Sequence, residues 1–130
     1  MQSLITGERS NIKIINSEFI NTHFERSKVF EVKNCESFYA AETNFANEAE
    51  LDETYTFDLS AIDQVTIVNS VFTKAGKIAN MVNIREDIIF SFNTVFTLPT
   101  DIILDIQESA QSSLFNNKFI STTVKEEEDI

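Results

Sequence analysis

Several short segments of the chain alternate apolar and polar residues, and each places one acid or amide between apolar neighbours. They read "VFEVK" (29–33), "TFDLS" (56–60), "MVNIR" (81–85) and "ILDIQ" (103–107). Alternation with period two is typical of a strand with one buried face, so the central polar residue points outward. These outward residues form one candidate ligand-binding set: Glu31, Asp58, Asn83 and Asp105.

If the segments lie side by side, these carboxylates stand about 5 Å apart. Carboxylates at that distance repel one another, and a cation or sugar hydroxyls would relieve the repulsion. A pair of them could also act as the acid and base of glycoside cleavage. The alternative is a solvated strand face whose charge is balanced by Lys33 and Arg85. We expect no catalytic residue, no metal-binding residue and no cofactor.

A repeat explains why these segments should lie side by side. Phenylalanines recur at separations of 26, 27, 24 and 23 residues, and an asparagine or glutamate stands three positions before each. A period near 25 residues with three short strands suits one coil of a parallel β-helix, in which each strand pairs with its equivalent one coil away. The two columns are Phe19, Phe45, Phe72, Phe96 and Phe119, and Asn16, Glu42, Asn69, Asn93 and Asn116.

The repeat predicts an all-β solenoid of about five coils, with roughly 25 residues per coil. Residues 1–124 would form this one domain, and residues 125–130 would form an acidic tail. The phenylalanine column should stack inside the solenoid. The asparagine column should mark a corner, because the chain has only 2 Gly and asparagine tolerates the left-handed backbone.

The phrase "I-x-I-x-N-[ST]-x-F" appears here as "IKIINSEF", "VTIVNSVF" and "IIFSFNTVF". It resembles the parallel β-helix repeat of the pectin-lyase-like superfamily, over roughly residues 4–124. The resemblance implies a right-handed solenoid with an asparagine ladder at the second corner, and it favours a cell-surface or extracellular location. That superfamily holds polysaccharide lyases, glycoside hydrolases, phage tailspikes and adhesins.

The hydrolase motifs "NTD", "DD", "GHG" and "RIK" do not occur in this sequence. We therefore expect a non-enzymatic structural or adhesive interaction module, as a fragment or subunit of a larger surface protein or multi-protein assembly. The alternative is a carbohydrate-binding or polysaccharide-cleaving β-helix that uses the acidic set.

A second candidate surface is apolar. By alternation and position near the asparagine column, several large apolar residues point outward and form a stripe along one side. Monomers seldom leave such a stripe bare, so it would mark a protein contact. The alternatives are that a turn rotates these residues inward, or that a neighbouring solenoid segment covers them. The predicted contact residues are Val68, Phe90, Phe92, Phe115, Val71 and Val95.

The formal net charge is −11, which disfavours nucleic acid as a partner because phosphate binding needs clustered Lys and Arg. It also disfavours an anionic membrane surface. No apolar run approaches the roughly 18 residues of a membrane span. The expected partners are therefore a protein or neighbouring solenoid segments, with a glycan under the alternative function.

Overall fold

The structure is a computed structural model that describes residues 3–8, 11–21, 28–47, 55–73, 77–97 and 104–121. Within these ranges every regular element is a β-strand and there is no helix. The acidic tail predicted at 125–130 lies outside the described residues. The strands are β1 (Ser3–Glu8), β2 (Ile12–Ile15), β3 (Glu18–Asn21), β4 (Lys28–Ala41), β5 (Asn44–Asn47), β6 (Tyr55–Val68), β7 (Val71–Thr73), β8 (Lys77–Ser91), β9 (Thr94–Thr97), β10 (Leu104–Gln107), β11 (Ser112–Phe115) and β12 (Lys118–Ser121).

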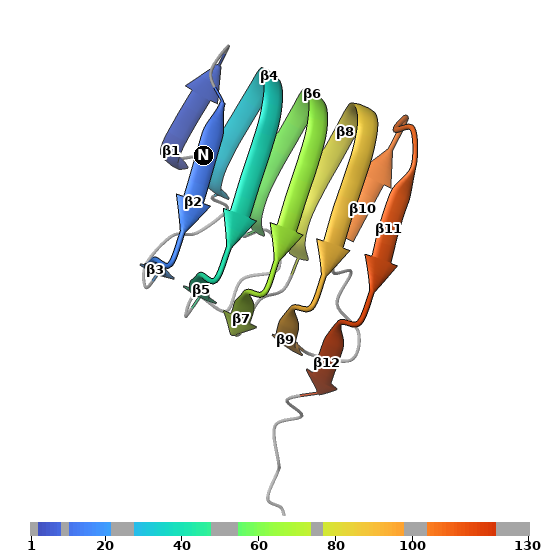
Figure 1. The fold of residues 1–130 in the computed structure, drawn as a ribbon. Coiled ribbons are helices and arrows are strands. Elements are labelled where there is room, and N and C mark those ends of the chain that lie inside the picture. Colours follow the sequence, from blue (N-terminus) through green and yellow to red (C-terminus); the bar gives the residue numbers. More distant parts are fainter. Residues whose placement is uncertain are drawn as a thin grey trace, which may run out of the picture.

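The strands stack in layers along one axis, and every pair is parallel (Figure 1). One sheet runs β1-β4-β6-β8-β10, with β2 beside β4 and β11 beside β8; the other runs β12-β9-β7-β5-β3. This is a parallel β-solenoid of about 3 turns, which confirms the predicted all-β solenoid. The predicted count of about five coils is not confirmed, because only short separate strands form the two end layers.

Among the described residues the chain bends at two kinds of corner, and both use the left-handed backbone. Within the described ranges, every non-glycine residue with positive φ falls in one of two columns set by the strand register. Asparagine is frequent in both columns because its short polar side chain tolerates this conformation. The first corner bends the long strands β4, β6 and β8 and also precedes β11. Its left-handed residues are Asn34, Ala61, Asn83 and Glu108. The second corner precedes the short strands β3, β5, β7, β9 and β12. Its left-handed residues are Asn16, Glu42, Asn69, Phe92 and Asn116.

Phenylalanine rings fill the interior of the first three layers. Phe19 stacks on Phe45 with ring centroids 5.6 Å apart, and Phe45 stacks on Phe72 at 5.0 Å. From the opposite sheet, Phe57 meets Phe45 edge-on at 5.1 Å. Burying each such side chain contributes about 1.5–3 kcal/mol. The stacking predicted for Phe19, Phe45 and Phe72 is therefore confirmed.

The predicted phenylalanine column is wrong in the next layer. The register pairs Phe72 with Val95, which is fully buried, whereas Phe96 is only half-buried. The cause is local, because Phe92 rather than Asn93 occupies the left-handed second corner. Each later residue of that layer is thereby shifted by one place, and a shift of one residue exchanges the two faces of a strand.

A polar ladder runs inside the second corner, one position after the left-handed corner residue of each layer. The Oδ1 atom of Asn93 accepts a hydrogen bond from the Ser70 N–H at 2.9 Å, and its Nδ2 donates to the Ile67 carbonyl at 2.9 Å. Each side chain thus satisfies backbone groups close to the corner. The ladder consists of Ser17, Thr43, Ser70, Asn93 and Asn117.

Candidate functional site

The acidic set predicted on the first strand is largely brought together. The register aligns Glu31 with Asp58, Asp58 with Asn80, and Asn80 with Asp105. These side chains are half-buried. Asn83 is not part of this row, because it lies in the first corner with φ 58°. Its predicted place in the row is therefore wrong, because Asn80 is the residue of β8 that pairs with Asp58.

We name the aligned residues Glu31, Asp58, Asn80 and Asp105 the acidic row. An amide, that of Asn80, interrupts its series of carboxylates. Glu31 and Asp58 lie on adjacent strands, about 4.8 Å apart at the backbone. Asn80 separates Asp58 from Asp105, and its Nδ2 donates to Asp58 Oδ1 at 3.4 Å. Within the described ranges, no three His, Cys, Asp or Glu side chains gather so as to hold a metal ion. The row can accept hydrogen bonds from hydroxyl groups.

Two of the predicted contact residues, Phe90 and Val95, are fully buried and cannot face a partner. Phe90 pairs with Ile67 in the preceding layer and with Leu114 in the following one, as an inner residue of β8. The one-residue shift at the Phe92 corner, which moves Phe96 out of the core, also moves Val95 into it. The predicted stripe is thus wrong at these two positions.

Other predicted contact residues are exposed at or next to the second corner, and we name them the corner ridge: Val71, Phe92 and Phe115. Their exposed fractions are 37%, 52% and 48%. The rings of Phe92 and Phe115 meet edge-to-face, with centroids 5.6 Å apart and an interplanar angle of 80°. Val68, the remaining predicted contact residue, is half-buried.

Phe92 is the unusual member of the corner ridge. Its φ of 57° lies in the left-handed region, where a residue of this kind costs about 1–2 kcal/mol. The hydroxyl of the adjacent Ser91 is buried and has no hydrogen-bond partner in the described structure. The sequence pattern missed this arrangement because it favoured Asn93 at the corner. The equivalent corner residues of the other layers are polar: Asn16, Glu42, Asn69 and Asn116.

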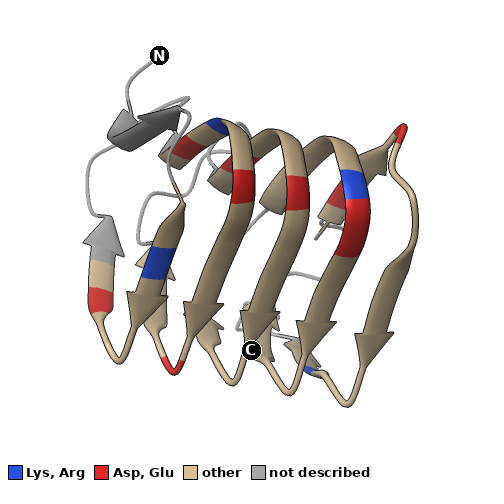
Figure 2. Cartoon of the chain, turned by 45° about the horizontal axis from the view of Figure 1, so that its top comes forward, with Lys and Arg blue, Asp and Glu red and all other residues tan. Residues whose placement is uncertain are grey.

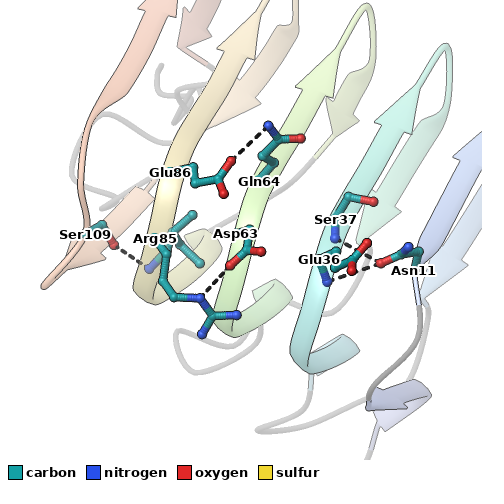
Figure 3. A network of polar contacts seen from close by, with 9 residues as sticks. Asn11, Glu36, Ser37, Asp63, Gln64, Arg85, Glu86 and Ser109 are labelled. Carbon is teal, nitrogen blue, oxygen red and sulfur yellow. Dashed lines mark hydrogen bonds and ion pairs between the residues drawn. The ribbon is translucent and has the colours of Figure 1, made fainter.

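A polar network lies beside the first corner (Figure 3). Arg85 forms an ion pair with Asp63 one layer away, and Gln64 Nε2 donates to Glu86 Oε1 at 3.2 Å. Acidic residues recur along this bend of the long strands, with few basic ones among them (Figure 2). The partners of the ion pair are 45% and 31% exposed, so it contributes only about 0–1 kcal/mol. This side of the molecule is a solvated acidic surface, in contrast to the corner ridge.

The fold assignment rests on the strand pairing within this chain. Neither a protein-family model nor a curated protein nor a solved structure matches the sequence. Membership of the pectin-lyase-like superfamily therefore stays a prediction, while the parallel β-solenoid is established by the register of its strands. None of the described residues forms a helix with the length and hydropathy that a membrane crossing requires.

Proposed function

We propose that this protein is a non-enzymatic structural or adhesive module that binds a protein partner through the corner ridge, within a larger surface protein or assembly. We also propose that the solenoid is a right-handed, pectin-lyase-like β-helix of about five coils. Two facts support this finer description. The short strands of both end layers continue the register of the complete turns. Parallel crossover connections are right-handed in nearly all proteins.

The observation that carries the proposal is Phe92. A large apolar ring stands in a left-handed corner and is half exposed, although polar residues fill the same corner in the other layers. Backbone strain of this kind persists at sites of function more often than elsewhere. The edge-to-face pair with Phe115 contributes about 0.5–1.5 kcal/mol, which does no more than offset the backbone cost. Stability alone therefore gives little reason for Phe92.

The chemistry of the ridge defines the partner. Aromatic side chains that are exposed and paired act as anchors in protein interfaces, where they fill apolar pockets. The net charge of −11 opposes binding to nucleic acid or to anionic lipid. A protein surface with an apolar pocket is the partner that fits.

The test is photo-crosslinking in the cells that make the protein, with a crosslinking residue placed at position 92 and, as a control, at Ala61 in the first corner. We expect one partner protein to be captured from position 92 and not from position 61. The identified partner is then purified and titrated against Phe92→Asn and Ala61→Asn. Phe92→Asn should weaken binding by about tenfold or more, while Ala61→Asn should leave it unchanged. Equal crosslinking from both positions, or equal affinity of both variants, would refute the proposal.

A second candidate is binding or cleavage of a carbohydrate at the acidic row. The observation in its favour is the in-register placement of Glu31, Asp58, Asn80 and Asp105 on one strand face. Glu31 and Asp58 lie on adjacent strands, about 4.8 Å apart at the backbone, which is close to the carboxyl separation of about 5–5.5 Å that retaining glycosidases use. A glycan array and a calcium titration test this candidate. Binding that is lost in Asp58→Asn would support it, and no binding by the unmodified protein would exclude it.

A further inference from the structure

The two ends of the solenoid differ in how well they cover their inner side chains. At the end formed by β11 and β12, Leu114 and Phe119 occupy inner columns but are 47% and 52% exposed. At the other end, Ile14 on β2 is 7% exposed. Within the described ranges no strand pairs with the outer edges of β11 and β12 or of β2 and β3. Such edges present unpaired N–H and C=O groups that another strand can complete.

The outer layers match each other at two inner columns and at the second corner. Following the register through the stack, Ile14 and Leu114 lie in one inner column, and Phe19 and Phe119 lie in another. Asn16 and Asn116 both occupy the left-handed second corner. If β2 and β3 of a second copy followed β11 and β12, the exposed Leu114 and Phe119 would be covered by the layer that carries Ile14 and Phe19 in that copy. The corners would also continue without a break.

Charge favours the same alignment. Glu18 and Lys118 lie in one outward column, joined through Asn44, Val71 and Thr94. Both are exposed. In a head-to-tail stack, Lys118 of one copy would stand beside Glu18 of the next, about 4.8 Å away at the backbone. Opposite charges on directly adjacent strands stabilise their pairing.

We propose that the end formed by β11 and β12 binds the β2 and β3 end of a second copy of this chain, so that copies stack head to tail in one register. This inference does not rest on the partner proposed for the corner ridge, because it uses the end of the solenoid and the strand edges; Phe115 at the end of β11 belongs to both surfaces. The contact is heterologous, so it extends to open-ended rows and not to a closed pair. The net charge of −11 opposes it, and all measurements should therefore share one salt concentration.

Sedimentation velocity of the 130-residue chain at increasing concentration tests the inference. We expect the mean sedimentation coefficient to rise with concentration. Lys118→Glu should weaken association about tenfold, because it turns an attraction into a repulsion. Adding Glu18→Lys to that variant should restore association. Ala61→Asn, at the first corner of an inner layer, is the matched control that should leave it unchanged.

A second measurement fixes the direction of stacking. Glu18→Cys and Lys118→Cys are introduced together and the protein is oxidised. These positions lie about 19 Å apart in one copy, so only neighbouring copies can join them. We expect links from position 18 of one copy to position 118 of the next. A concentration-independent monomer, links that join two positions 118, or a charge swap that fails to restore association would each overturn the inference. Loss of association in Phe92→Asn alone would instead assign it to the corner ridge.

Discussion

Replacing Phe72 by alanine tests the stacked core most directly. Phe72 is fully buried, stacks on Phe45 at 5.0 Å and also contacts the ring of Phe57 at 6.1 Å. The lost transfer free energy is about 1.5–3 kcal/mol, and the lost ring pairing adds about 0.5–1.5 kcal/mol. With the cavity that remains, the expected loss is about 3–5 kcal/mol, which is a large part of the stability of an ordinary domain.

Phe96→Ala is the matched control, because it removes the same atoms from a different environment. Phe96 is half-buried, so the expected loss is about half of the transfer free energy, or about 0.8–1.5 kcal/mol. Equilibrium unfolding in urea, followed by circular dichroism, gives both free energies of unfolding, and an unchanged slope with denaturant makes them comparable. Equal losses for the two variants, or a larger loss for Phe96→Ala, would show that the inner column passes through Phe96 and that Phe72 does not pair with Val95.

Further variants test single features of the corners and of the ladder, each by urea unfolding. Ser91→Ala should be neutral or stabilising by about 1 kcal/mol, because the buried Ser91 hydroxyl has no partner in the described structure. Ser70→Ala should destabilise by about 1–2 kcal/mol, because the Ser70 hydroxyl donates to the Val68 carbonyl and accepts from the Thr43 N–H. A loss in Ser91→Ala as large as in Ser70→Ala would contradict this reasoning. Asn93→Ala should cost about 2–4 kcal/mol, since it leaves the Ser70 N–H and the Ile67 carbonyl without their side-chain partner in the interior; a change below about 1 kcal/mol would argue against the ladder. Ala61→Gly should stabilise by about 0–1 kcal/mol, because φ is 54° there and glycine adopts this backbone without steric cost. Ser60→Gly in the extended part of β6 should destabilise by about 0.5–1 kcal/mol. The reverse order would rule out a left-handed first corner.

The repeat spacing and the strand alternation were sufficient to predict the solenoid and the stacked rings of Phe19, Phe45 and Phe72. Side chains that must lie on their own equivalents in the next layer leave a periodic trace in the sequence. The alternating phrases around Phe30 and Phe57 likewise identified the first strand and the row that holds Glu31 and Asp58. These features depend on local pattern, which a single sequence contains.

The layer of β8 could not be predicted in the same way. In "SFNTVF", residues 91–96, asparagine follows phenylalanine, and either residue can be assigned to the corner by spacing. The choice depends on contacts from other layers, because the side chain of Asn93 is held inside by Ser70 and Asn117. β8 also carries an irregularity in its pairing with β6, between Ile62 and Gln64. An extra residue of this kind exchanges the inward and outward faces for the residues that follow it in the strand, and no local sequence preference predicts it.

The ladder inside the second corner gives the molecule a chemical polarity along its axis. The backbone N–H of Ser70 donates to Asn93 Oδ1, and the backbone N–H of Asn93 donates to Asn117 Oδ1. Each backbone amide is thus protected from solvent by a side chain of the layer that follows in the chain. Hydrogen–deuterium exchange should therefore be slow at Ser70 and Asn93 and should accelerate at Asn93 when Asn117 is changed to alanine. The backbone amide of Asn117 should exchange no faster in Asn93→Ala, because these bonds run from each backbone amide to the side chain of the following layer.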